Sequence, residues 1–209
     1  MRKIVLITIF SLGFITITFA QNITSGIKGG LNLSSLSIDG NNDKNLKIGL
    51  HAGVFTKISF NESFAVQPEL VYSGKGLKLD FADEIASAGE TKLNLNYIEL
   101  PVQLVYNLSN DFAFHFGPYL SYLLNANMKT DANVLNHYQI SSTDNLDKKH
   151  FNSFDFGLTG GLAYDLNPFI FGFNYSLGLT QVAKDNDVSH NIFGDAKNNV
   201  IQVYAGFKF

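Results

Sequence analysis

The sequence predicts an all-β protein, an eight-stranded antiparallel up-and-down transmembrane β-barrel preceded by a cleaved signal peptide. Three observations favour this fold. Apolar and polar residues alternate with a period of two along eight runs, as in strands that have two different faces. Long polar segments and tight turns connect these runs alternately, which is typical of outer-membrane barrels. Charged residues inside the runs all fall on the face opposite the apolar side chains.

Residues 169–180 form the clearest run. One face is apolar and the other is small or polar: Phe169, Phe171, Phe173, Tyr175, Leu177 and Leu179 alternate with Gly172, Asn174, Ser176, Gly178 and Thr180. A strand of about ten residues, tilted by about 45°, crosses an apolar band of about 25 Å. This run therefore predicts a strand that crosses a membrane.

The other seven runs repeat this pattern in chain order. They cover residues 26–34, 50–60, 64–73, 98–106, 112–124, 154–164 and 201–209. We expect long loops at 39–45, 80–91, 129–150 and 184–197, and tight turns at 61–63, 109–111 and 167–168.

Four residues disturb the pattern of the runs. Pro68 and Pro101 lack the backbone N–H that a strand ladder needs, so each predicts a bulge or a local break in pairing. Leu93 and Leu95 are in the opposite phase to the run that follows them. We therefore expect a bulge or a phase change at residues 96–98.

Residues 1–20 are predicted to be a signal peptide, and residues 21–209 the barrel domain. Arg2 and Lys3 precede an apolar stretch that ends near Ala20, a small residue suited to signal peptidase. An N-terminal anchor is the alternative, although the stretch is short for a membrane span.

Composition excludes several classes of function. The chain has no Cys, so it forms no disulfide, catalytic thiol or zinc–thiolate site. Its net charge of -3 provides no basic surface for nucleic acid. We expect no cofactor and no metal, because no phosphate-binding glycine motif or complete calcium loop is present.

Charge decides which face of the barrel points outward. A soluble lipocalin-like barrel would have the same alternation with the apolar face inside. Three acids and three bases lie on the polar face, which suits a lumen but is little charge for a water-exposed exterior. The phenylalanine-rich face is therefore predicted to contact lipid.

We predict a packed polar network in the lumen, because an eight-stranded barrel is only wide enough for side chains to fill it. A narrow gated pore and a proton or ligand site are the alternatives. The predicted members are Lys28, His51, Lys57, Gln67, Glu69, Glu99, Gln103, His115, Asp155 and Lys208.

Four segments resemble a known family. They are Gly26-Ile27-Lys28-Gly29-Gly30-Leu31-Asn32-Leu33-Ser34, Gln67-Pro68-Glu69-Leu70-Val71-Tyr72-Ser73-Gly74-Lys75-Gly76, Tyr97-Ile98-Glu99-Leu100-Pro101-Val102 and Phe116-Gly117-Pro118-Tyr119-Leu120. In this order and spacing they resemble the PorT-type outer-membrane β-barrel family of Bacteroidetes. The resemblance implies an outer-membrane barrel from a Bacteroidetes-like source, and it provides no catalytic residues.

Two classes of function follow. One is a structural or surface-interaction barrel whose four external loops contact a protein partner or surface ligand. The other is an accessory component of a protein-secretion or transport machine, as the PorT resemblance implies. We expect no enzymatic activity, because the loop residues His137, Ser141, Ser142, His150, Ser189 and His190 have no triad-like spacing.

The expected location is the cell outer membrane, with both termini in the periplasm and the lipid bilayer as the permanent partner. Phe209 ends an apolar stripe and resembles the C-terminal signal that the barrel assembly machinery recognises. Alternatively, Phe209 belongs to a periplasmic aromatic girdle with Phe60, Phe64, Phe112 and Phe169.

Overall fold

The computed structural model describes residues 22–37, 46–82, 87–134, 138–146, 150–184 and 196–209. It contains the strands β1 (Asn22–Ser37), β2 (Lys47–Ser59), β3 (Phe64–Ala82), β4 (Ser87–Asn107), β5 (Phe112–Val134), β6 (Tyr138–Leu146), β7 (Phe154–Leu166), β8 (Phe169–Gln181) and β9 (Lys197–Lys208). No helix within these residues is long and apolar enough to span a membrane. The predicted signal peptide, residues 1–20, lies outside the described residues.

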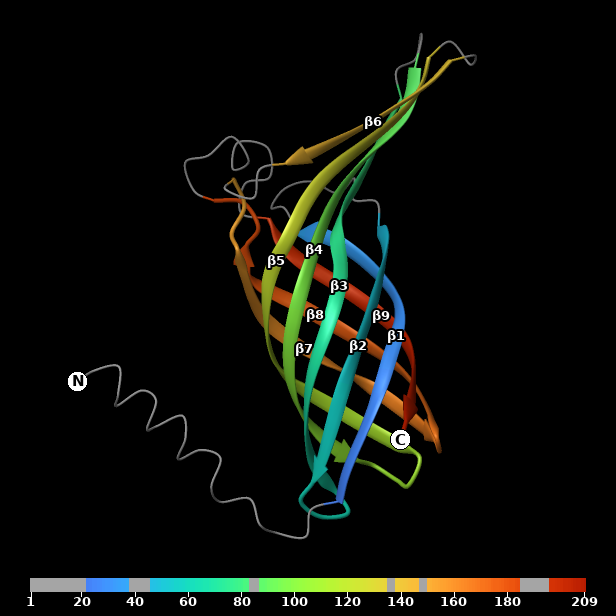
Figure 1. Cartoon of the computed structure of the whole chain (residues 1–209), viewed down its shortest axis with the longest axis vertical. Coiled ribbons are helices and arrows are strands. Elements are labelled where there is room, and N and C mark those ends of the chain that lie inside the picture. The colour runs from blue at the N-terminus through green and yellow to red at the C-terminus, as the bar shows by residue number, and fades with distance from the viewer. Residues whose placement is uncertain (1–21, 38–45, 83–86, 135–137, 147–149, 185–195) are drawn as a thin grey trace, which may run out of the picture.

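Eight of these strands close into an antiparallel barrel (Figure 1). Each strand of the ring β1-β2-β3-β4-β5-β7-β8-β9 pairs with the next, and β9 pairs back with β1. The ninth strand, β6, pairs with the far end of β5 and lies outside the ring. The predicted all-β barrel of eight strands is confirmed, and the additional strand is a feature that the sequence did not indicate.

Alternation along the strands separates an apolar outer wall from a polar interior. Leu177 on β8 is 39% exposed on the outside, whereas its neighbour Ser176 is 4% exposed and donates a hydrogen bond inside the barrel to the Thr159 hydroxyl of the adjacent strand β7. Phe, Leu, Ile and Val dominate the exposed positions of every ring strand. Such a wall is stable only against lipid, because water would be in contact with an apolar surface all round the barrel.

Aromatic pairs border this wall at both ends. At the turn end, rings pair between neighbouring strands: Phe64 with Tyr106, Phe112 with Tyr164, and Phe169 with Phe207. At the other end Tyr122 pairs with Phe154, with ring centroids 5.3 Å apart. Tyr122 follows Phe112 by ten residue steps along β5, which at about 3.4 Å per step and a tilt of about 40° is about 25 Å. The wall therefore matches the apolar thickness of an outer membrane.

Strands β3 to β6 continue beyond the Tyr122 end as a four-stranded sheet (Figure 1). We call it the projecting sheet: residues 77–82 of β3, 87–95 of β4, 126–134 of β5, and β6. Its pairing continues to Ala82↔Ala88 between β3 and β4 and to Val134↔Tyr138 between β5 and β6. The predicted loops at 80–91 and 129–150 are thus largely wrong, because the acidic, small and polar residues that suggested loops belong to paired strands.

Of the two predicted irregularities at residues 96–98, the bulge is confirmed, because the β4–β5 register shifts between Asn96 and Tyr97. A phase change in β4 is not seen, since Leu93, Leu95 and Tyr97 keep the inward phase of Glu99 and are buried. The register does shift here, but the extra residue is on the facing strand, since Asn96 pairs with Asn125 and Tyr97 pairs with Leu123. The inward stripe of β5 therefore changes phase at the bulge, from Leu123 to Ala126, while that of β4 is continuous.

Glycine is required where β3 leaves the ring. Gly76 has a φ of 139°, in the region that side chains disfavour, and a Cβ there would lie 1.9 Å from the Leu93 carbonyl oxygen.

The predicted breaks at the prolines are confirmed. No β2 partner is paired with Pro68, and the β3–β4 ladder is interrupted between Pro68 and Val71, opposite Pro101.

Candidate functional site

An apolar cluster closes the barrel at the end from which the sheet projects. We call it the apolar cap; its buried members are Leu36, Leu77, Leu93, Leu95, Tyr97, Leu123, Ala126, Phe151, Val182, Ala183 and Ala196. They come from β1, β3, β4 and β5 and from the segments next to β7, β8 and β9. Met128 and Leu146 pack against the cap from the projecting sheet. Because the cap excludes water, the lumen does not continue through this end.

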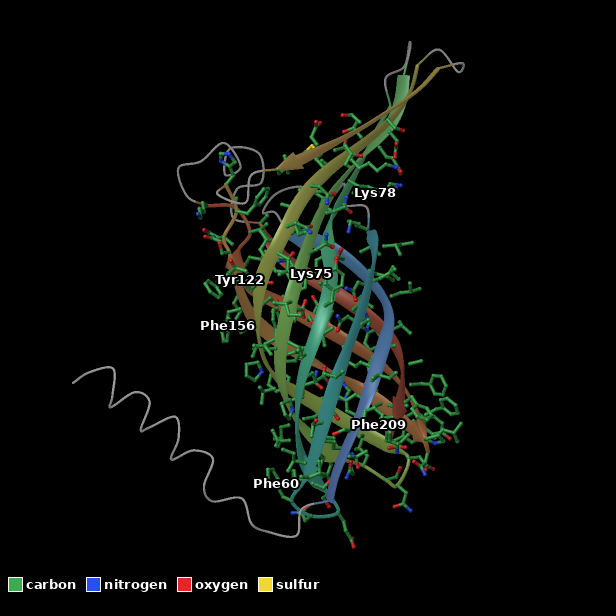
Figure 2. The ribbon with its side chains drawn as sticks, in the orientation of Figure 1. Phe60, Lys75, Lys78, Tyr122, Phe156 and Phe209 are labelled. Carbon is green, nitrogen blue, oxygen red and sulfur yellow. The ribbon has the colours of Figure 1, made fainter. Side chains whose placement is uncertain are left out.

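Lys75 lies beneath the apolar cap and is the centre of the polar interior (Figure 2). Its side chain is buried, and its Nζ lies 2.8 Å from a Glu99 oxygen and 3.3 Å from Asp155 Oδ2. The ammonium also lies over the ring of Tyr119, 4.6 Å from the centroid. Figure 2 shows Tyr122 and Phe156 pointing away from the barrel while Lys75 lies within it.

Asp155 receives further hydrogen bonds at both carboxylate oxygens. The Tyr119 hydroxyl and the Asn198 amide donate to Oδ2, at 3.2 Å and 3.1 Å, and the Thr180 hydroxyl donates to Oδ1 at 2.9 Å. A buried charge is tolerated only when its partners replace the water that it loses. The group thus ties β3, β4, β5, β7, β8 and β9 together around one lysine.

A second buried ion pair lies deeper in the barrel. Lys28 of β1 pairs with Glu69 of β3, and Gln67 donates from Nε2 to the other Glu69 oxygen at 2.7 Å. The Lys28 ammonium lies 4.8 Å from the centroid of the Tyr204 ring. A cavity of about 10 Å³ bounded by Glu69, Glu99 and Gln103 separates the two ion pairs. It has room for about one water molecule.

The two predicted lumen histidines hydrogen-bond to asparagines. His51 Nδ1 and Asn32 Oδ1 are 2.7 Å apart, and Asn32 in turn donates to Ser73 and to the Gly74 carbonyl. His115 Nε2 and Asn174 Oδ1 are 2.5 Å apart. Both histidines are almost fully buried; His51 links β2 to its neighbour β1, and His115 links β5 to β8, with β7 between them. These contacts favour a structural role.

The remaining predicted members lie inside the barrel as well. Gln103 is buried, while Lys57 and Lys208 lie at the mouth of the lumen at the turn end. Sequence reasoning missed Lys75, because the predicted strand ended at Ser73. The inward phase Gln67, Glu69, Val71, Ser73, Lys75 and Leu77 continues without interruption, and this period could have revealed it.

The outer face of the projecting sheet carries its polar residues in rows. Nearest the barrel, Asn94 donates to Asn127 and Asn96 donates to Asn125, at 2.9 Å and 2.6 Å. The next row contains Lys78, Lys92 and Lys129, and the row beyond contains Glu90 and Asp131.

Ion pairs join the lysine row to the acidic row. Glu90 pairs with Lys78 at 2.8 Å and with Lys92, and hydrogen bonds from both lysines lower the pKa of Glu90. Asp131 accepts from the Ser141 hydroxyl at 2.5 Å and pairs with Lys129 at 3.0 Å, and these two contacts lower the pKa of Asp131. The charges of this face are therefore largely compensated within the sheet.

Of the loop residues considered for catalysis, the structure describes Ser141, Ser142 and His150. Ser141 donates to Asp131 and Ser142 donates to Asp144. His137, Ser189 and His190 lie outside the described residues. Within the described part of the chain, no group of three or more His, Cys, Asp or Glu side chains is arranged to hold a metal.

The closed ring, the apolar wall of membrane thickness, the two aromatic borders and the polar interior define a transmembrane β-barrel. Residues 19–184 match the family described as outer membrane protein beta-barrel domain, and the chain belongs to that family. The protein is accordingly an outer-membrane protein. A search of curated protein sequences finds no match to the chain.

Solved structures with similar strand layouts include three bacterial outer-membrane proteins. Ail of Yersinia pestis has 14% sequence identity and a TM-score of 0.47, covering 90% of this chain and 99% of its own. Neisserial surface protein A has 13% identity and a TM-score of 0.48, covering 88% and 97%. OprG of Pseudomonas aeruginosa has 16% identity and a TM-score of 0.40, covering 90% and 97%.

Proposed function

We propose that this protein is a non-conducting outer-membrane barrel that presents its projecting sheet to a partner outside the cell. The observation that carries this proposal is the length of the sheet. Strand β5 continues for residues 123–134 beyond Tyr122, which at about 3.3 Å per residue and a tilt of about 40° is about 30 Å. A structure of this length has no role in closing the barrel.

A preformed sheet is a better binding surface than flexible loops, because less ordering free energy is lost when a partner binds. The paired asparagines and the compensated charges support a sheet that keeps its shape in water. Of the four predicted external loops, two are thus replaced by one ordered surface.

A narrow pore is disfavoured by the apolar cap and by the two buried ion pairs, which leave little space for water along the lumen. The alternative is an accessory role in a secretion or transport machine, and the four PorT-like segments are the observation that favours it. Enzymatic activity is not part of either proposal.

In the proposed orientation the projecting sheet is extracellular and both termini are periplasmic. The tight turns at 60–63, 108–111 and 167–168 lie at the same end as the start of β1 and the end of β9. Short turns are typical of the periplasmic end of outer-membrane barrels. This arrangement supports the orientation.

The test is proximity cross-linking on intact cells, comparing the full chain with a short-sheet variant. The variant lacks residues 79–91 and 130–142, each replaced by a two-residue Asn-Gly turn, and keeps Leu77, Leu93 and Leu146 of the apolar cap and its border. A surface partner that cross-links to the full chain should be lost from the variant, while heat-modifiable migration of the barrel is kept.

Two outcomes would contradict the proposal. Stoichiometric periplasmic or membrane partners that are captured equally by both chains would favour the secretion-machine role. Absence of any partner that depends on the sheet, in cells that display the full chain at their surface, would exclude a surface-interaction role for the sheet.

A further inference from the structure

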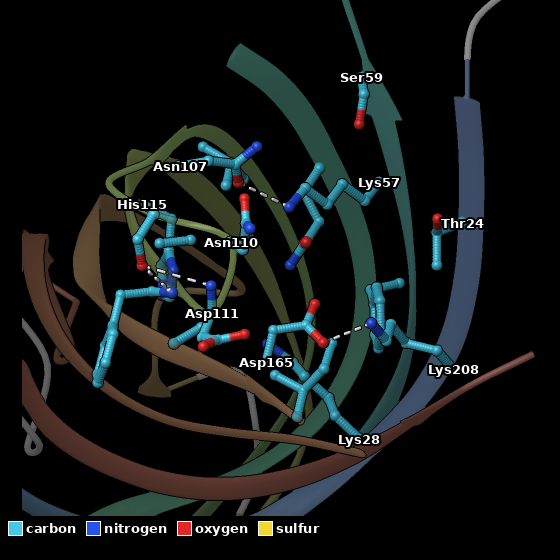
Figure 3. Close-up of a pocket in the computed structure, with 18 of the residues that line it drawn as sticks. Thr24, Lys28, Lys57, Ser59, Asn107, Asn110, Asp111, His115, Asp165 and Lys208 are labelled. Carbon is cyan, nitrogen blue, oxygen red and sulfur yellow. Dashed lines mark hydrogen bonds and ion pairs between the residues drawn. The ribbon is translucent and has the colours of Figure 1, made fainter. Parts of the chain in front are cut away.

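The lumen opens at the turn end into a pocket of about 120 Å³ (Figure 3). This pocket is at the opposite end of the barrel from the projecting sheet and is not used by the proposed function. Its charged lining residues are Lys28, Lys57, Asp111, Asp165 and Lys208. The inner wall includes His115 and Tyr204, which are nearly fully buried. The pocket is therefore a blind recess that a molecule can enter from the turn end.

Most of these charges have partners. Lys28 pairs with Glu69, and Lys208 Nζ lies 2.5 Å from Asp165 Oδ1. Asp111 is exposed on the turn, where water screens its charge. Lys57 is different. It is half-buried, and within the described residues no carboxylate lies within 4.0 Å of its ammonium.

One contact positions the Lys57 ammonium in the pocket. Lys57 Nζ donates to Asn107 Oδ1 at 2.9 Å (Figure 3). Asn107 in turn donates from Nδ2 to the Glu62 carbonyl at 2.6 Å. The second bond fixes the asparagine so that its oxygen is directed to the lysine. An ammonium has three N–H donors, so two remain for a molecule in the pocket.

We propose that this pocket binds a small oxyanion, a carboxylate or a phosphate, with Lys57 as its anchor and Lys208 as a second positive group. A half-buried cation attracts an anion more strongly than an exposed one, because water screens the charge less. The neutral residues Thr24, Ser59 and Asn110 line the recess and supply hydrogen-bonding groups around the anion.

The size of the recess limits the ligand. A protein cavity of about 150 Å³ holds a molecule of the size of benzene. Acetate and inorganic phosphate fit a recess of about 120 Å³, whereas citrate does not. Because the recess is closed by Lys28, His115 and Tyr204 on its inner side, binding does not imply transport.

The experiment is a titration of the full mature chain, refolded in detergent, with acetate, phosphate and citrate at constant ionic strength. Backbone amide shifts measured by NMR give both affinity and position. We expect saturable shifts confined to residues 57, 107–113 and 208, with a dissociation constant on the order of 1 mM for acetate or phosphate. Citrate should produce no saturable shift. Comparison of acetate with phosphate identifies which oxyanion the recess prefers.

Three variants test the anchor. Lys57→Gln should weaken binding by at least about tenfold, because it removes the pocket ammonium that has no carboxylate within 4.0 Å among the described residues. Lys129→Gln makes the same change of charge on the projecting sheet and should leave binding unchanged. Asp165→Asn should tighten binding by about threefold to tenfold, since it frees Lys208 and removes a negative charge beside the anion.

Equal affinity in Lys57→Gln and the unsubstituted chain would overturn the proposal. So would shifts that map to the projecting sheet, or a complete absence of saturation with both acetate and phosphate. If Lys57→Gln does not fold, as judged by heat-modifiable migration, weaker or unchanged binding in folded Asp165→Asn overturns the proposal by itself.

Discussion

Replacing Lys75 with Met should destabilise the barrel by about 3 to 5 kcal/mol, the usual cost of breaking a buried ion pair. The loss should arise mainly at Glu99. Asp155 keeps three hydrogen-bond donors, from Tyr119, Asn198 and Thr180. Glu99 instead loses Lys75, its ion-pair partner at 2.8 Å among the described residues. The measurement is urea unfolding in lipid vesicles, followed by gel mobility, which gives the free energy of unfolding.

Two further variants make this prediction specific. Lys129→Met removes an exposed lysine that pairs with Asp131, and it should cost at most about 1 kcal/mol. Adding Glu99→Gln to Lys75→Met should recover at least about half of the loss, because the second change removes the unpaired carboxylate. The double-mutant cycle should then give a coupling energy above about 1 kcal/mol. Additive effects of the two changes, or a Lys75→Met loss no larger than that of Lys129→Met, would refute the assignment of Lys75 to a buried network.

Three other changes test separate parts of the account. Leu177→Arg should lower the free energy of unfolding in lipid by about 2 to 4 kcal/mol, and Leu177→Ala by far less, because Leu177 faces the membrane; equal losses would show that the face is misassigned. The contacts of Glu90 and Asp131 lower the pKa of each group from its usual value, 4.5 for Glu90 and 3.8 for Asp131. They stabilise the folded sheet fully at a pH above these usual values, and this stabilisation is lost as the pH falls through the lowered pKa values. The protection factors of the amides in β5 and β6, which correct for the intrinsic pH dependence of exchange, should therefore fall on acidification in the unsubstituted chain but much less in Glu90→Gln/Asp131→Asn, and identical pH dependence in both would contradict this. If Phe209 is an assembly signal, deleting it should reduce insertion in cells while refolding into detergent stays nearly unchanged. A small, equal decrease in both insertion and refolding would instead assign Phe209 to the aromatic girdle.

The ring strands were predictable because lipid imposes one strict condition on each of them. Every outward side chain must be apolar, so the period of two is clear in runs such as 169–180, where the exposed residues are the predicted Phe, Tyr and Leu. The six predicted interior charges lie inside the barrel for the same reason. The closure of β9 on β1 followed from the even number of such strands.

The projecting sheet was missed although part of its sequence alternates as well, with Leu93 and Leu95 on one face and Lys92 and Asn94 on the other. The acidic and small residues of 80–91 and the polar residues after Lys129 favoured loops instead. Lys75 was missed since it follows Gly74 and precedes Gly76, a sequence that is typical of a turn. The apolar cap joins residues as distant in sequence as Leu36 and Ala196, and no local pattern reveals such a cluster.

A planar-bilayer recording tests the central claim, a filled lumen closed at its outer end, most directly. The pure protein is inserted into the bilayer beside a general porin as the positive control. The buried Lys75 and Lys28 ion pairs and the apolar cap leave no continuous water path through the barrel. We expect no stable conductance from this protein, and steady steps of porin size would contradict the account.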